Sequence, residues 1–346
     1  MRQGRVRTES TVQRFAKTPI GEGFDLWDRD YLLGAMRLFL FKAETAPPFQ
    51  VGPCMDATGE ILVQLEELED AREQFSIAAE KYLITQQQQL AKIMEIKALE
   101  CERGPQAALE ELTAFLKKET ASTNATAVPA PITRAYAYQA ELLLKTATPE
   151  TPELFTEAVE TAKLACNHAW DRVHMGYVVL GDALKASGCP DEARKAYSEA
   201  FETNRNCITA LERHIEVLKE YIAESNDDMR IEALRKELLP LLESAISLHP
   251  RPTLIREKAF LLSETLGDAA ALEFLDPLIC NPPPEEADAA GNVGGRTVAT
   301  LLKAKAAILA DGGKMQEALE VAEAALKESP SDEEAKAIVA ELRESL

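Results

Sequence analysis

The chain has 346 residues, of which 46% are hydrophobic, and this share is enough to bury a substantial core. Its 58 Asp and Glu residues outnumber 38 Lys and Arg residues, giving a net charge of −20. Such an acidic balance argues against broad contact with phosphate backbones, so nucleic acid is not an expected partner. No apolar run approaches the about 20 residues of a membrane-spanning helix. Six cysteines without a short paired spacing favour a reducing compartment, and we expect a cytoplasmic protein.

Residues 1–24 are predicted to form an extended basic arm, because they show no apolar periodicity. The first 20 residues contain five cations and one anion, Glu9. The cations are Arg2, Arg5, Arg7, Arg14 and Lys17. Such an arm could dock on an acidic surface such as tubulin, RNA or anionic lipid, or serve only as a solubilising tail.

The arm leaves two locations open besides the cytoplasm. Docking on tubulin would make the protein a cytoskeletal or ciliary (axonemal) scaffold component. An N-terminus that is rich in Arg and contains Ser and Thr is also compatible with a presequence for the mitochondrial matrix.

Residues 25–50 are predicted to contain an N-terminal helix that is apolar on almost every side. Leucine, methionine and phenylalanine side chains between residues 31 and 44 cover the whole helical wheel. A helix of this kind is either buried by its neighbours at the start of an array or forms an end where a partner docks.

Residues 177–205 predict two short amphipathic helices joined by a turn. The turn contains Ser187, Gly188, Cys189 and Pro190, and proline fits the first turn of the second helix. Side chains at offsets of three and four share one face of each helix: Tyr177, Leu180, Gly181 and Leu184 in the first, and Ala193, Tyr197 and Ala200 in the second. A small residue at 181 facing a small residue at 193 lets the two helices approach closely.

The same separation of twelve residues between small side chains recurs at 59/71 and at 306/318. This pattern resembles the tetratricopeptide (TPR) repeat, a helical hairpin with a period of about 34 residues. The resemblance implies an all-α fold, a right-handed α-solenoid of about seven TPR-like helix pairs. Repeats are expected in 51–130, 131–280 and 296–346, with a Pro/Gly-rich loop at 281–295 and a C-terminal capping helix at 332–345.

The resemblance also implies a non-enzymatic scaffold or adaptor that needs no cofactor. TPR proteins commonly hold a peptide or a helix of a protein partner in a groove lined by their first helices. One subset binds acidic C-termini through a clamp of Lys and Asn, and the matching positions here are Asp56, Glu60, Val178 and Asp182. These residues are acidic or apolar, so we expect no such clamp. We expect instead a concave groove, acidic to apolar in character, that prefers basic or apolar partners.

Other candidate chemistry is weaker. Cys166, His168 and His174 lie close together but lack the paired spacing of a zinc site, so structural or surface roles are predicted. The glycines of 291–297 lack the Lys and the preceding strand of a phosphate loop, which predicts a flexible connection. An RNA-associated helical-repeat protein of a mitochondrial particle stays open as an alternative.

Overall fold

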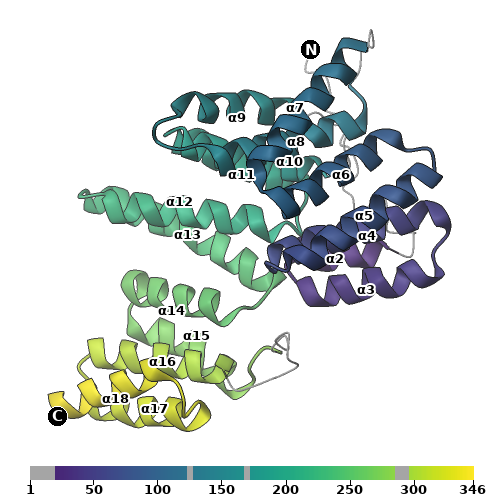
Figure 1. Ribbon diagram of the computed structural model, residues 1–346. Helices are drawn as coiled ribbons and strands as arrows, with labels where there is room; N and C mark the ends of the chain where they lie inside the picture. The colour runs from purple at the N-terminus through teal and green to yellow at the C-terminus, as the bar shows by residue number, and fades with distance from the viewer. Residues whose placement is uncertain (1–19, 123–127, 167–171, 285–295) are drawn as a thin grey trace, which may run out of the picture. The chain divides into compact units, whose positions relative to one another are not determined.

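The computed structural model describes residues 20–122, 128–166, 172–284 and 296–346. These residues form helices and turns without a strand, and they divide into two compact units, Met1–His214 and Ile215–Leu346 (Figure 1). The predicted all-α architecture is confirmed. None of the described helices is long and apolar enough to cross a membrane.

The N-terminal unit is a series of helix pairs. Its helices are α2 (Gly21–Asp28), α3 (Leu32–Thr45), α4 (Pro48–Gln64), α5 (Leu68–Ile84), α6 (Gln88–Arg103), α7 (Pro105–Ser122), α8 (Ala130–Thr146), α9 (Pro152–Ala165), α10 (Val173–Ala186) and α11 (Pro190–Thr203). Each helix packs against the next one in the chain, as expected for helical hairpins stacked in order.

The helices of three pairs touch where a glycine meets an aromatic ring sixteen residues later. A Cβ atom on Gly59 would lie 2.6 Å from Phe75 Cε1, so only glycine leaves room for the ring. The pairs that share this geometry are Gly23–Phe39, Gly59–Phe75 and Gly181–Tyr197. The glycines at 59 and 181 are thus tightly packed, but each lies against the aromatic ring sixteen residues later and not, as predicted, against the small residue twelve residues later.

A fully buried alanine follows each of these glycines by twelve residues. Ala71 and Ala193 occupy the predicted positions, and Ala35 holds the equivalent position in α3. The same spacing joins Ala306 to Ala318 in the C-terminal unit, and both are completely buried.

The first helix pair was not predicted. Its first helix, α2, begins at Gly21, inside the segment that we expected to be extended up to residue 24. Because α2 has only eight residues, its apolar pattern is too short to identify a helix, although Gly23, Ala35 and Phe39 keep the repeat spacing. Residues 1–19 lie outside the described part of the chain.

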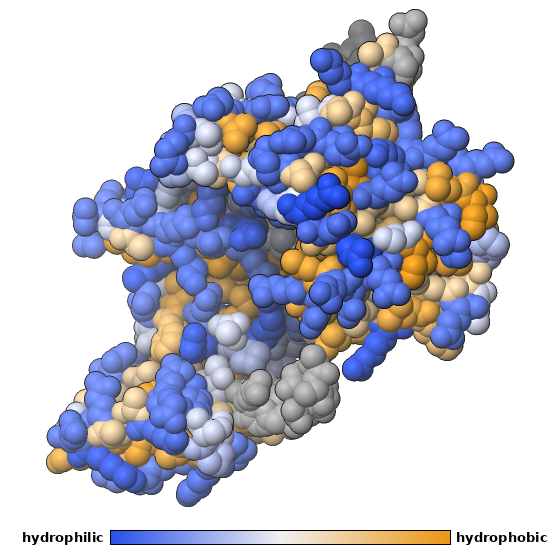
Figure 2. All heavy atoms as spheres, viewed as in Figure 1, coloured by the Kyte–Doolittle hydropathy of each residue, from blue (hydrophilic) through white to orange (hydrophobic). Residues whose placement is uncertain are grey.

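The helix that the sequence showed as apolar on every side, α3, is only partly covered. It packs against α2 and α4 and buries Ala35 and Phe39 fully, while Leu40 and Phe41 are 40% and 60% exposed. Orange, apolar surface is visible over the region of α3, α4 and α5 in Figure 2. Among the described residues, neighbouring helices therefore do not bury α3 on every side, and the helix is closer to the second predicted situation, an end of the array.

Helix α12 (Ile208–Glu224) crosses the division between the units. The C-terminal unit continues with α13 (Asp228–Leu248), α14 (Pro252–Leu266), α15 (Asp268–Cys280), α16 (Arg296–Asp311), α17 (Met315–Glu328) and α18 (Glu333–Ser345). The last helix packs Val339 and Leu342 against α16 and α17. Its start is capped by Asp332, whose Oδ1 accepts hydrogen bonds from the backbone N–H groups of Glu334 and Ala335 at 3.0 and 3.1 Å. The predicted terminal helix is thus present, whereas most of the predicted loop at 281–295 lies outside the described residues.

Candidate functional site

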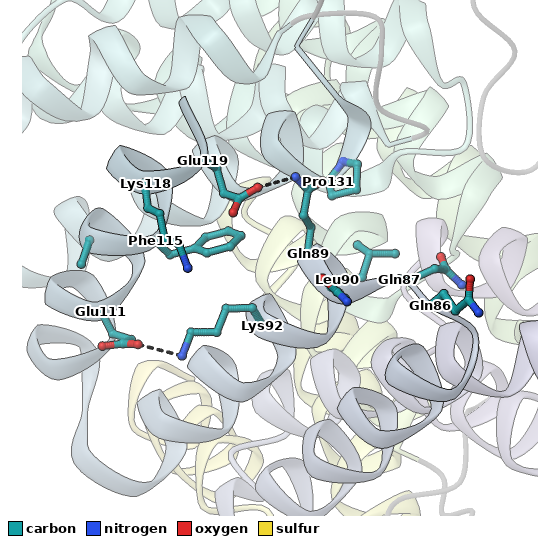
Figure 3. A pocket seen from close by; sticks show the side chains of 12 residues that line it. Gln86, Gln87, Gln89, Leu90, Lys92, Glu111, Phe115, Lys118, Glu119 and Pro131 are labelled. Atoms are coloured by element: carbon teal, nitrogen blue, oxygen red, sulfur yellow. Dashed lines mark hydrogen bonds and ion pairs between the residues drawn. The ribbon is translucent and has the colours of Figure 1, made fainter. Parts of the chain in front are cut away.

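An open pocket of about 770 Å³ lies where the start of α6 meets α7 (Figure 3). Glutamine side chains from 86–89 line it, together with two carboxylates that each have a partner in the pocket. Lys92 Nζ lies 2.7 Å from Glu111 Oε1, and Gln89 Nε2 donates to Glu119 Oε2 at 2.6 Å. The pocket contains none of the residues that the sequence predicted for partner binding, and its mixed lining singles out no ligand.

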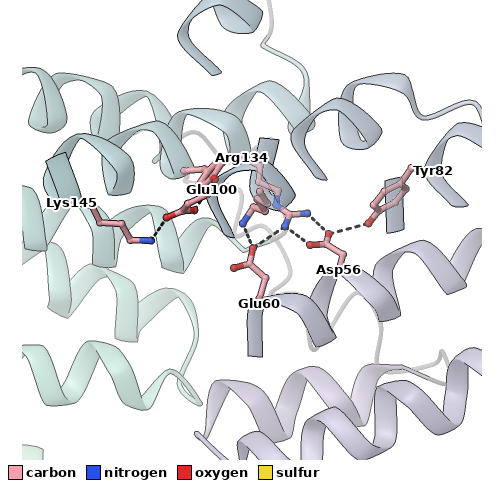
Figure 4. Close-up of polar contacts among 8 residues, drawn as sticks. Asp56, Glu60, Tyr82, Glu100, Arg134 and Lys145 are labelled. Carbon is pink, nitrogen blue, oxygen red and sulfur yellow. Dashed lines mark hydrogen bonds and ion pairs between the residues drawn. The ribbon is translucent and has the colours of Figure 1, made fainter. Parts of the chain in front are cut away.

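Two of the predicted groove residues, Asp56 and Glu60, lie elsewhere, on the face formed by the first helices α4, α6 and α8 (Figure 4). The side chain of Arg134 extends from α8 to α4, where its guanidinium donates two hydrogen bonds to Asp56, at 2.5 and 2.7 Å. Tyr82 in α5 donates a third hydrogen bond to the same carboxylate at 3.1 Å. The Asp56 side chain is only 6% exposed, so this paired arrangement is what keeps a buried charge stable.

Glu60, one turn after Asp56, joins the same cluster. It accepts hydrogen bonds from Arg134 Nη2 at 3.2 Å and from the Lys97 ammonium in α6. Burial alone would raise the pKa of Glu60, but the charges of Lys97 and Arg134 outweigh it and lower this pKa to about 2. Glu60 is therefore ionised and neutralised within the chain.

The cluster continues along α6 and α8. Tyr138 donates to Glu100 Oε2 at 2.7 Å, and Lys145 Nζ lies 2.7 Å from the other oxygen of Glu100. Burial, reinforced by Glu100, raises the pKa of Tyr138, so the phenol stays protonated and remains a donor. We call the set Asp56, Glu60, Lys97, Glu100, Arg134, Tyr138 and Lys145 the inner-face network.

Glu141 belongs to the same face but differs from its neighbours. Burial raises its pKa to about 7, Lys97 opposes this shift, and the negative charge of Glu60 adds to it. The ionisation of Glu141 therefore changes near neutral pH.

A second set of contacts joins α2 to the start of α10, although the residues lie 144 positions apart. Arg172 Nη2 donates to Asp28 Oδ1 at 2.9 Å, and Asn204 Nδ2 donates to Asp28 Oδ2 at 2.7 Å. His174 Nε2 lies 3.4 Å from Oδ1, and the Arg172 guanidinium lies 4.0 Å from the Trp27 ring. Burial would raise the pKa of Asp28, but Arg172 and His174 lower it, so its carboxylate is ionised.

The recurring glycine, alanine and aromatic positions, and the stacking of the hairpins in chain order, decide the type of fold. The chain is a TPR-like helical-repeat protein. The sequence of this TPR-like protein matches no protein-family model and no curated protein.

Solved structures are similar to it at low identity. A tetratricopeptide repeat protein from Parabacteroides merdae is 14% identical over 85% of this chain and 99% of its own, with a TM-score of 0.37. A Rap protein complexed with competence and sporulation factor is 14% identical over 75% of this chain and 72% of its own, with a TM-score of 0.41. The assembly chaperone of RpL4 (Acl4) is 15% identical over 95% of both chains, with a TM-score of 0.31.

The residues predicted for partner binding in this TPR-like protein lie in different surroundings. Asp56 and Glu60 belong to the inner-face network, where Arg134 and Lys97 pair with their charges. Val178 is 3% exposed and lies in a buried cluster with Ala200 and Cys207, so its side chain is covered within the chain.

Asp182 remains 31% exposed and accepts a hydrogen bond from Tyr197 at 2.8 Å, with Arg213 Nε at 3.5 Å. The expected acidic-to-apolar groove is thus, on α4, α6 and α8, a face of paired charges. Arg2, Arg5, Arg7, Arg14 and Lys17 lie outside the described residues.

The sequence analysis did not predict the cations of the inner-face network, although the repeat spacing marks the position of one of them. Lys97 follows Ile96, which precedes the buried Ala108 by twelve residues, just as Glu60 follows Gly59. Extending the repeat spacing to α6 would have placed a lysine beside Glu60. No such signal marks Arg134, because the turn between α8 and α9 interrupts the spacing.

The weak metal pattern has a structural explanation. His174 is fully buried against Asp28, in line with the predicted structural role, whereas His168 lies outside the described residues. In the described ranges, no group of three or more His, Cys, Asp or Glu side chains is placed to hold a metal ion. All six cysteines are free thiols.

Proposed function

We propose that the protein is a non-enzymatic scaffold that binds a protein partner through the exposed apolar surface of α3 and the start of α4. The observation that carries this proposal is the exposure of large apolar side chains there. Leu40, Phe41 and Phe49 are 40%, 60% and 59% exposed, although the neighbouring Phe39 is completely buried. Large apolar side chains exposed on two helices that pack against each other are typical of sites where a protein partner docks.

The charges of the inner face support α3 over the groove as the first contact. A basic or apolar partner on α4, α6 and α8 would have to compete with Arg134 for Asp56. Removing one partner from a buried ion pair costs about 3–5 kcal/mol, and an incoming peptide would have to offset that cost. The α3 surface requires no such rearrangement.

Affinity purification of the full chain from its own cells after mild cross-linking tests the proposal. We expect Phe41→Glu to lose specific partner proteins that the wild type retains. Leu266→Glu is the matched control, because it also replaces an exposed apolar side chain by glutamate. Leu266 is 68% exposed and lies at the end of α14, away from α3 in the sequence. Identical partners for wild type and both variants would refute the proposal.

The cationic arm is tested in the same experiment. Deleting residues 1–19 removes all five predicted cations but leaves α2 intact. Loss of cytoskeletal proteins, or of cytoskeletal staining, from this variant alone would favour the cytoskeletal and ciliary alternative. An unchanged partner set and an unchanged location would count against it, and relocation from mitochondria to cytoplasm would favour a presequence.

A further inference from the structure

The exposed side of α3 forms a single stripe along the helix. Residues at offsets of 4, 7, 8 and 11 from Leu33 point in similar directions on a helix of 3.6 residues per turn. They are the half-buried Leu33 and the exposed Arg37, Leu40, Phe41 and Glu44. Ala35 and Phe39 lie on the opposite side, where they are buried.

The stripe has an apolar centre and one charge of each sign. Leu40 and Phe41 are in the middle, Arg37 lies one turn before them, and Glu44 lies one turn after them. Both charged residues are exposed, and within the described part of the chain neither side chain makes a hydrogen bond or an ion pair. Charges that flank an apolar contact in this way set the direction in which a partner helix binds.

We propose that the occupant of this stripe is a second copy of the same chain, with the two α3 helices packed antiparallel. The inference rests on the proposed function, since it names the partner of the same surface. A two-fold axis between residues 40 and 41 places Arg37 opposite Glu44 of the partner subunit, and Leu40 opposite Phe41 of the partner subunit. A two-fold contact uses the same patch twice, so the patch must be complementary to itself, and this stripe is.

The alternative direction fails on charge. A parallel pair would put Arg37 against Arg37 and Glu44 against Glu44, which is repulsive. A contact between two helices also buries less than the about 1,200–2,000 Å² of a stable interface. We therefore expect a reversible dimer whose population rises with protein concentration.

Sedimentation velocity over a concentration series tests the pairing with charge reversals. Arg37→Glu and Glu44→Arg should each raise the dimer dissociation constant at least about tenfold, because each places like charges opposite each other twice. An equimolar mixture of the two variants should recover the wild-type dimer as a heterodimer. The double variant R37E/E44R keeps the wild-type net charge and should recover it as a homodimer.

Two controls accompany the charge reversals. Arg72→Glu changes an exposed arginine in α5 and should leave the dissociation constant unchanged, because α5 lies outside the stripe. Circular dichroism should show that every variant is folded, as expected for substitutions at exposed positions.

The outcomes separate this inference from the proposed function. A wild type that is monomeric throughout, or a mixture that stays monomeric, overturns the dimer. Loss of other partner proteins from Phe41→Glu would then still support the scaffold. A dimer that obeys the charge rules in a chain that captures no other protein would support the inference and refute the wider scaffold function.

Discussion

Arg134 holds the two acidic residues of α4 in place, and its replacement by methionine should destabilise the N-terminal unit. The variant removes two hydrogen bonds to Asp56 and one to Glu60. It leaves Asp56 buried with Tyr82 as its remaining described donor. Losing one partner of a buried ion pair costs about 3–5 kcal/mol. Because the Arg134 side chain is 19% exposed, water reaches the site, and we expect a loss near 3 kcal/mol.

Urea unfolding followed by tryptophan fluorescence measures this loss in the correct unit. One of the two tryptophans of the chain, Trp27, lies in α2 of the N-terminal unit, and the sequence of the C-terminal unit contains no tryptophan. Lys163→Met is a suitable control, because Lys163 and Glu160 form an exposed pair 2.8 Å apart. That variant should change the free energy of unfolding by less than about 0.5 kcal/mol.

A double-mutant cycle identifies the pair itself. Asp56→Asn combined with Arg134→Met should cost less than the sum of the two single variants, by about 1 kcal/mol or more. A loss below about 1 kcal/mol for Arg134→Met, or strictly additive losses, would refute the view that the two charges stabilise each other.

Three further predictions concern the same unit. Gly181→Ala should lower the free energy of unfolding by about 1–3 kcal/mol, because a Cβ atom there overlaps the Tyr197 ring, and an unchanged thermal melt would contradict the packing. The pKa of Glu141 is about 7 in the folded chain against 4.5 ordinarily, so its stabilisation is complete below about pH 4.5 and is lost as the pH rises through 7. Glu141→Gln should remove this decline from the urea midpoints, and a decline that persists would argue against the assignment. Asp28→Asn leaves Arg172, whose side chain is 14% exposed, without its counter-charge and should cost on the order of 3 kcal/mol, measured by tryptophan fluorescence, whereas an unshifted midpoint would mean that α2 is held by its apolar contacts alone.

The repeat architecture could be predicted because close helix packing restricts residue identity. Glycine at 59 and 181 and alanine twelve residues later are the small side chains that such a contact requires. The first helix pair was not predicted because α2 is short, even though Gly23 and Ala35 keep the same separation of twelve residues.

The site was only partly predictable. The repeat places Asp56 on a first helix, but its partner Arg134 is 78 residues away. Their meeting depends on how successive hairpins stack, which is set by contacts between helices and not by a motif. Val178, at the equivalent repeat position, is as buried as Asp56, but it lies in an apolar cluster and not in a network of charges.

Hydrogen–deuterium exchange of the full chain, with and without bound partner, tests most directly where the protein binds. We predict slower exchange in α3, residues 32–45, on binding or at concentrations that favour the dimer. Exchange in α6 and α8 should stay unchanged, since their charges are already paired within the chain. Protection of α6 and α8 with no change in α3 would contradict the account and return the binding site to the inner face.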